Sequence, residues 1–302
     1  MHVNKGFSAM LGIHLMILLL STLISSAALA NTVAERPLRF APIPMASKEH
    51  MAQEYLPFLD YLEQHTDQRY ELAYHAHYAD LLNDFAEDKI DLAYLGPLPY
   101  IALTERISQV APVVQFLDAS GASAYTCALV AFAGQTEVFR AIESSESSIA
   151  LTQPLSTCGY LVMNQELKQR TGLGLDRYSY VYTGSHEEVA LGVILGNYAL
   201  GSMKTLIATQ YHHLGLRVLA ESLPMPGFLL VANTHTVSAE TVQALKTLLA
   251  ALDPLNVPAD QEAVRAWSAS LCCGAVEVEA QAYDDIRADW LELDIDLLDT
   301  YP

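Results

Sequence analysis

Between residues 38 and 106, short apolar stretches alternate with longer stretches of helical periodicity. The pattern predicts buried strands at 38–43, 70–74 and 90–95, and helices at 49–64, 78–86 and 98–105. Strands that alternate with helices at this interval form βαβ units on a mostly parallel sheet. Ligands on such sheets bind beyond the carboxyl ends of the strands, and Gly96-Pro97 follows the third strand directly.

A second series of strands and helices lies between two polar stretches, 118–123 and 222–227, which are typical of crossovers. It predicts strands at 125–132, 148–151, 178–182, around 198 and at 216–219, and helices from 160 to about 169, from 185 and from 202. A strand at 228–231 could rejoin the first sheet, and helices are expected at 237–252 and 283–298. The sequence therefore predicts two α/β lobes with a hinge and a cleft: residues 31–122 with 225–302, and residues 123–224.

The first thirty residues have the features of a secretory signal peptide. Lys5 gives a positive start, residues 10–20 form an apolar run, and Ala28-Leu29-Ala30 fits a cleavage site. Because the apolar run is too short to span a bilayer comfortably, cleavage near Ala30 is favoured over an uncleaved anchor. We expect an exported, periplasmic protein.

The formal net charge is −19, and loss of the signal peptide removes one basic residue and no acid, which leaves 15 basic and 35 acidic residues, or −20. Such a surface is unsuited to nucleic acid. An anionic small ligand is still possible, because exposed charges are screened within about 10 Å whereas a helix terminus acts at contact distance.

Four cysteines are present, Cys127, Cys158, Cys272 and Cys273. Export permits disulfides, but four cysteines allow three pairings and their spacing matches no zinc site. Because Cys272 and Cys273 are adjacent, they cannot easily bridge each other. The sequence alone leaves the pairing open.

Ser156, Thr157, Cys158 and Gly159 lie where a short apolar strand gives way to a helical pattern that begins near Tyr160. Main-chain N–H groups at a helix start have no partner within the helix, and the two hydroxyls add donors. A phosphate-like group could form several hydrogen bonds there, each worth about 1.5–3 kcal/mol, without a neighbouring Lys or Arg. The alternative is an ordinary Ser/Thr N-cap.

Several motifs in this order resemble those of the periplasmic phosphate/phosphite/phosphonate-binding proteins of ABC importers. They are the segments 78–82, 91–100, 156–160, 185–187, 222–226 and 283–287. The resemblance implies a type II solute-binding fold, with a mixed sheet in each lobe and two hinge crossovers, that captures a phosphorus oxyanion for a membrane permease. It implies a binding protein, without a cofactor or a metal and expected to be a monomer, rather than an enzyme.

Matched to that family, Ser156 and Thr157 would bind the phosphoryl oxygens, beside Cys158 and Gly159 of the same motif. His186 would donate a further hydrogen bond, and Tyr78 and Tyr100 would reach the ligand from the opposite lobe. The expected site is uncharged and rich in donors, so ligand binding would bury less charge than an arginine clamp would.

Three departures from the family pattern narrow the expected ligand. Cys158 replaces a hydroxyl residue and could be bonded to Cys127. Ala199 occurs where the family often has Asp, and Gly227-Phe228 where binders of aminoalkylphosphonates have a carboxylate. A ligand ammonium would lack partners, which favours phosphate, phosphite or a simple alkylphosphonate.

Two other function classes share these residues. Ser156 and His186 with an Asp could form a hydrolase triad, although no G-x-S-x-G motif is present. A soluble anion-sensing subunit of a membrane kinase would have the same fold and site.

His75 and His77 alternate on a strand, but two histidines without a third ligand favour a solvated strand end over a metal site.

Overall fold

The computed structural model describes residues 36–144 and 148–293, and the described residues from 37 onward form one compact unit. The expected signal peptide and the end of the last expected helix, from residue 294, lie outside the described residues. No helix within the described ranges is long and apolar enough to cross a membrane.

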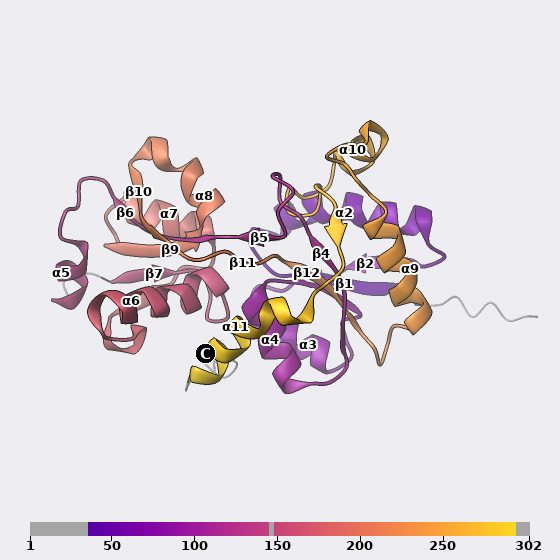
Figure 1. The fold of residues 1–302 in the computed structure, drawn as a ribbon, viewed down its shortest axis with the longest axis horizontal. Helices are drawn as coiled ribbons and strands as arrows, with labels where there is room; N and C mark the ends of the chain where they lie inside the picture. Colours follow the sequence, from indigo (N-terminus) through magenta and orange to yellow (C-terminus); the bar gives the residue numbers. More distant parts are fainter. Residues whose placement is uncertain (1–35, 145–147, 294–302) are drawn as a thin grey trace, which may run out of the picture. The chain divides into compact units, whose positions relative to one another are not determined.

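Six strands form a mixed sheet (Figure 1). In spatial order they are β13 (Ala275–Val276), β4 (Val110–Phe116), β12 (Leu229–Asn233), β3 (Leu92–Leu95), β1 (Leu38–Pro42) and β2 (Tyr70–Leu72). Strand β1 is parallel to β2 and β3, whereas β12 is antiparallel to β3 and β4. The helices in this part of the chain are α2 (Lys48–His65), α3 (Tyr78–Ala86), α4 (Pro97–Arg106), α9 (Ala239–Ala250) and α10 (Pro258–Val264). The predicted parallel units and the strand that rejoins this sheet are confirmed.

Five strands form a second mixed sheet. Their order is β10 (Leu216–Glu221), β6 (Cys127–Phe132), β9 (Leu200–Lys204), β7 (Ile149–Leu151) and β8 (Tyr180–Tyr182). Strand β7 is parallel to β8 and β9, and β6 is antiparallel to β9 and β10. The helical segments here are α5 (Val138–Glu143), the π-helical turn η1 (Thr157–Val162), α6 (Met163–Thr171), η2 (Leu175–Arg177), α7 (His186–Ile194), α8 (Thr205–Gln210) and η3 (His212–Leu214).

The chain leaves the first sheet through β5 (Ala124–Tyr125) and returns through β11 (Met225–Pro226). These two strands pair antiparallel, with Tyr125 opposite Met225 and Ala124 opposite Pro226. The two strands lie side by side as a short ribbon (Figure 1). Strand β11 lies within the second predicted crossover, 222–227, whereas β5 follows directly after the first, 118–123. A ribbon of this length has few hydrogen bonds, so it can bend with little loss of structure, as a hinge requires.

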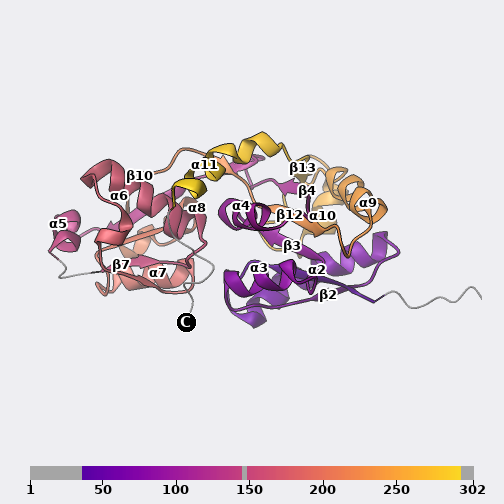
Figure 2. The ribbon, with the colours of Figure 1, turned by 90° about the horizontal axis from the view of Figure 1, so that it is seen from below.

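The C-terminal segment consists of the 3₁₀ turn η4 (Ala280–Tyr283) and helix α11 (Asp284–Glu292). The Tyr283 hydroxyl donates to the Gly227 carbonyl oxygen at 2.9 Å, and its ring lies 5.0 Å from that of Tyr100 in α4. The Gln165 amide of α6 donates to Asp289 of α11 at 2.6 Å. Figure 2 shows α11 beside α4. The last helix therefore packs on helices from both parts of the chain.

An aromatic cluster fills one side of the first sheet, where alternating strand residues meet the apolar face of α2. Phe58 of α2 lies 5.0 Å from Trp267 and 5.6 Å from Phe40, measured between ring centroids. Tyr94 of β3 lies 5.7 Å from Phe116 of β4, and both are buried. Aromatic pairs at these separations add about 0.5–1.5 kcal/mol each beyond the burial of their surface.

One predicted boundary was wrong in a way that affects the site. A helix was expected from Ser202, but β9 continues through Lys204 and α8 begins at Thr205. The reason is that β9 lies between β6 and β7, where Gly201 packs so closely on α7 that an added Cβ would lie 2.6 Å from Val189. Central strands are stabilised by such packing over local helix propensity. Helices α5 and α10 were not predicted.

Candidate functional site

A small chamber is lined by residues from both α/β parts of the chain. Its walls are Ile43, Tyr78, Gly96, Pro99, Tyr125, Ser156, Thr157, Cys158, His186, Lys204 and Phe228. The chamber has a volume of about 10 Å³, which is room for about one water molecule. Five predicted site residues therefore lie together on its wall, whereas Gly159 and Tyr100 do not belong to the lining.

Four helical segments begin at this chamber. Tyr78 and His186 are the first residues of α3 and α7, and Gly96 and Ser156 are the N-caps of α4 and η1. Each helix start carries partial positive charge and N–H groups without a partner inside the helix. Four such starts facing one chamber favour an anion there.

The Ser156 hydroxyl caps its own helical turn. Its Oγ accepts a hydrogen bond from Gly159 N at 2.9 Å, and the Ser156 carbonyl accepts from Leu161 N at 3.3 Å, which is the π-helical pattern. The N-cap alternative is thus confirmed for this hydroxyl, and it does not exclude a ligand role, because a hydroxyl that accepts can still donate. Gly159 has a packing role, since a Cβ there would lie 2.1 Å from Thr152 Oγ1.

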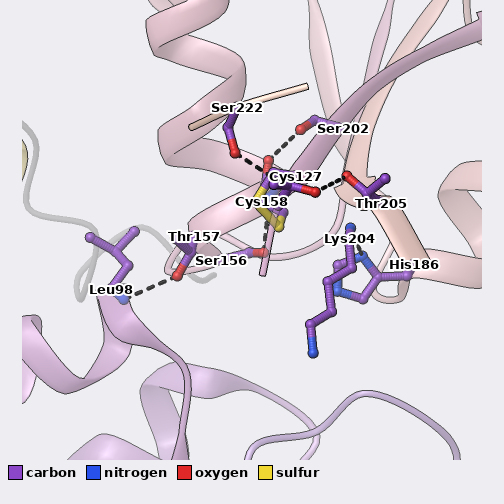
Figure 3. The surroundings of a disulfide bond; sticks show 12 residues. Leu98, Cys127, Ser156, Thr157, Cys158, His186, Ser202, Lys204, Thr205 and Ser222 are labelled. Carbon is purple, nitrogen blue, oxygen red and sulfur yellow. Dashed lines mark hydrogen bonds between the residues drawn. A yellow bond between two sulfur atoms is a disulfide. The ribbon is translucent and has the colours of Figure 1, made fainter. Parts of the chain in front are cut away.

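Thr157 connects the two walls. Its Oγ1 accepts a hydrogen bond from Leu98 N, in the first turn of α4, at 3.0 Å (Figure 3). Burial raises the pKa of Tyr125, and a side-chain hydrogen bond with Thr157 offsets part of that rise, so the phenol of Tyr125 is neutral. The Thr157 hydroxyl therefore lies at a helix start where an anion's oxygen would also be favourable.

A disulfide joins Cys127, the first residue of β6, to Cys158 in η1. The neighbouring Ser202 hydroxyl donates to the Cys158 carbonyl, and Cys127 N donates to Ser222 Oγ at 3.0 Å (Figure 3). This is the bridge that the departure at Cys158 suggested. Cys272 and Cys273 are free.

His186 is buried and neutral. Burial, and then the positive charge of Lys204, lower the pKa of His186 from 6.5 to about 3. Its Nδ1 accepts a hydrogen bond from Lys204 N at 3.4 Å, which places the ring proton on Nε2 (Figure 3). The ring thus has an N–H donor available at Nε2.

We expect a His186→Asn variant to be less sensitive to acid than the unmodified protein. Below pH 6.5 the unfolded chain binds a proton at this histidine, whereas the folded protein does not until about pH 3. Stability therefore falls as pH falls through this window. Urea denaturation at pH 7 and pH 4 should show that the unmodified protein loses about 3 kcal/mol more than the variant. Equal losses would contradict a buried neutral His186.

Lys204 is a charged chamber residue that the sequence did not suggest, and the expectation of an uncharged pocket is wrong. Its Nζ lies 4.8 Å from the centre of the Tyr125 ring and 4.4 Å from that of Phe228. Burial lowers the pKa of Lys204 to about 8, and the carboxylate of Asp118 opposes that shift. The side chain is therefore mostly protonated at neutral pH. A cation over two aromatic rings belongs to the chamber wall.

The two predicted tyrosines differ in position. Tyr78 lines the chamber, and its main-chain N–H donates to Gln153 Oε1 at 3.0 Å, a second hydrogen bond across the chamber. Tyr100 packs against Tyr283 at 5.0 Å between ring centroids. Tyr100 therefore has a core position in α4. Gln153 was not predicted, because nothing in its local sequence distinguishes it.

The predicted histidine pair at the strand end forms no metal site. His75 Nε2 lies 3.0 Å from an oxygen of Asp84, which also pairs with Lys89. Within residues 36–144 and 148–293, no group of three or more His, Cys, Asp or Glu side chains could hold a metal ion.

The geometry differs from a hydrolase triad at His186. In a triad, the histidine Nδ1–H donates to a carboxylate that orients the ring. Here Nδ1 is instead an acceptor for the main-chain N–H of Lys204. His186 is thus arranged as a hydrogen-bond donor through Nε2. Its Nδ1 contacts a main-chain N–H and not the carboxylate that orients the histidine of a triad.

The profile of the ABC transporter, phosphonate, periplasmic substrate-binding protein family matches residues 40–283. The chain belongs to this family. It is 24% identical over 287 residues to the "Phosphate-import protein PhnD" of Mycolicibacterium smegmatis, which covers 85% of this chain and 87% of that protein. The family consists of periplasmic substrate-binding proteins of ABC transporters, so membership implies an extracytoplasmic location, a small ligand and a membrane permease.

Two solved structures of phosphonate-binding proteins share the fold. PhnD1 of Prochlorococcus marinus, in complex with methylphosphonate, has a TM-score of 0.73 at 14% identity and covers 86% of this chain and 99% of its own. A binding-protein component of the Pseudomonas aeruginosa phosphonate transporter has a TM-score of 0.73 at 19% identity, covering 85% and 86%. The predicted fold class, a two-lobe periplasmic-binding-protein fold with a mixed sheet in each lobe, is confirmed.

Proposed function

We infer that this protein binds a phosphorus oxyanion, such as phosphate, phosphite or a simple alkylphosphonate, and passes it unchanged to the permease of an ABC importer. The observation that carries this inference is the convergence of four helix starts and Lys204 on one chamber. Such a site provides N–H groups, hydroxyls and one cation for the oxygens of a tetrahedral anion. The phosphate- and phosphonate-binding relatives support the same ligand class.

In this proposal, Ser156, Thr157 and His186 donate to the phosphoryl oxygens, with Tyr78 approaching from the other wall. A chamber with room for about one water must widen to admit such an anion. The widening would occur by bending at β5 and β11, between a lobe of residues 31–122 with 225–302 and a lobe of residues 123–224. The hydrogen bonds of Thr157 to Leu98 and of Gln153 to Tyr78 would break and reform.

The ligand class is tested by calorimetry and thermal shift of the unmodified protein with phosphate, phosphite and methylphosphonate. At least one should bind, and saturation at about 100 times Kd should stabilise the protein by about 2.7 kcal/mol. Sulfate is the control for a general anion effect. Absence of heat and of a thermal shift with every phosphorus oxyanion would exclude the proposed function.

Thr157→Ala is expected to weaken binding of the preferred oxyanion by about 1–3 kcal/mol, because a buried hydroxyl donor is lost. Ser156→Ala should have an effect of the same order. Thr157→Ser keeps the hydroxyl and is the matched control, expected to bind within about threefold of the unmodified protein. Equal affinity of the Ala and Ser variants at position 157, measured by calorimetry, would remove Thr157 from the ligand site.

The inferred lack of catalysis is tested separately. The unmodified protein should release no phosphate or alcohol from aryl phosphates and carboxylic esters, with inactivated protein as the blank. Hydrolysis of either substrate by the unmodified protein, lost in Ser156→Ala, would show that the protein is a hydrolase.

A further inference from the structure

Lys204 lies where the chamber meets a larger groove. The groove has a volume of about 550 Å³ and shares Tyr125, His186, Lys204 and Phe228 with the chamber. Lys204 is the last residue of β9, so its side chain projects from the carboxyl end of a central strand. A substituent on an anion held in the chamber would extend into the groove past these four residues.

Within the part of the chain that the structure describes, the ammonium of Lys204 has aromatic neighbours and no carboxylate partner. The rings of Phe228 and Tyr125 lie 4.4 and 4.8 Å from Nζ. Asp118 affects Lys204 only through its charge, because Asp118 Oδ1 accepts from Ser120 N, Ser120 Oγ and Ala122 N in its own turn. Among the described residues, Lys204 forms no ion pair. A partly buried cation of this kind is stabilised by an anion that binds beside it.

We propose that Lys204 determines which substituents the site accepts. Its ammonium supplies positive charge at the junction of the chamber and the groove, so a phosphorus oxyanion with an uncharged or anionic substituent binds and one with an ammonium is excluded. A ligand ammonium would bring a second cation close to Lys204, and like charges within a few ångströms repel strongly where solvent is displaced. This inference rests on the proposed function and adds the residue responsible for selectivity.

The same arrangement predicts a pH dependence. An anion beside Lys204 raises the pKa of its ammonium above the value of about 8 that burial imposes, so the complex binds more protons than the free protein. Affinity is therefore highest below pH 8 and falls above it. The other ionisable groups that face Lys204 are Asp118, His186 and Tyr125, and the groove adds His50, Glu54, Glu187, Tyr94, Tyr211, Cys272 and Cys273. A variant without the Lys204 amine separates its contribution from theirs.

The test compares ethylphosphonate with 2-aminoethylphosphonate, whose main difference is the terminal ammonium, by calorimetry at pH 7. The unmodified protein should bind ethylphosphonate roughly 100-fold or more tightly than the amine. Lys204→Met should lose most of this discrimination and bind ethylphosphonate roughly 10- to 100-fold more weakly. Lys204→Glu should prefer 2-aminoethylphosphonate. The exposed Lys168→Met is the control and should behave as the unmodified protein.

Two further measurements distinguish selectivity from a folding role. Lys204→Met should unfold at a higher temperature than the unmodified protein without ligand, because it no longer buries a charge. The affinity of the unmodified protein for ethylphosphonate, divided by that of Lys204→Met at the same pH, should fall between pH 7 and pH 9.5, because this ratio removes the effect of the ligand's own ionisation. A purely structural lysine would give neither result.

The outcomes separate the two proposals. If the unmodified protein binds the two phosphonates equally or prefers the amine, the role of Lys204 is overturned while the function stands. The role is also overturned if Lys204→Met keeps the affinity, the discrimination and the pH profile. If no phosphorus oxyanion binds at all, the proposed function fails as well.

Discussion

A Gly159→Ala variant is expected to lose about 2–3 kcal/mol of stability and most of its affinity for phosphorus oxyanions. The added Cβ would lie 2.1 Å from Thr152 Oγ1, 2.9 Å from Thr152 N and 3.0 Å from Ser156 Oγ. Because Thr152 N belongs to the backbone directly after β7, this overlap cannot be relieved by a side-chain rotation alone. The turn that presents Ser156 and Thr157 must therefore shift.

Urea denaturation and calorimetry with methylphosphonate measure the two effects. Gly172→Ala is the control, since a Cβ there has nothing within 4 Å and meets only the strain of a φ of +78°. Adding Thr152→Ala to Gly159→Ala removes the closest contact and should restore part of the stability. A Gly159→Ala protein with unchanged stability and affinity would show that the turn tolerates displacement.

Removal of the disulfide is expected to cost about 3–4 kcal/mol. Cys127 and Cys158 are 31 residues apart, and a bridge that closes a loop of this length restricts the unfolded chain by about this amount. The bridge also ties η1 to β6, so the Cys127→Ser, Cys158→Ser double variant should bind phosphorus oxyanions less tightly. Cys272→Ser, at a free cysteine, is the control and should change stability little.

A reducing agent provides the complementary experiment. It should lower the unfolding free energy of the unmodified protein and of Cys272→Ser toward that of the double variant, whose own stability should not change. If the reductant leaves the unmodified protein as stable as before, the bridge contributes little to the folded state.

The sequence was most informative where strands and helices are regular. Helix α3 has the predicted bounds, because its apolar residues follow the helical period without interruption. The position of Ser156 before a helical turn was also predictable, since a strand followed by small polar residues is a common way to begin a helix.

The features that were missed depend on tertiary packing. Strand β9 is a central strand with Gly201 packed on α7, so it continues past the expected helix start. Its last residue, Lys204, therefore lies on the chamber wall. The Cys127–Cys158 bridge depends on the distance between β6 and η1, a Cα separation of 5.1 Å that no spacing rule supplies. Tyr100 was placed in the site by its motif, but its ring faces Tyr283, which is 183 positions later.

A crystal structure of the protein grown with methylphosphonate tests the proposed site most directly. The phosphorus atom should lie in the chamber, with its oxygens within hydrogen-bond distance of the Thr157 hydroxyl and His186 Nε2, and the methyl group should point toward the groove. Phosphonate density at another location, with the chamber walls still joined by the Thr157–Leu98 hydrogen bond, would contradict the assignment of this chamber as the anion site.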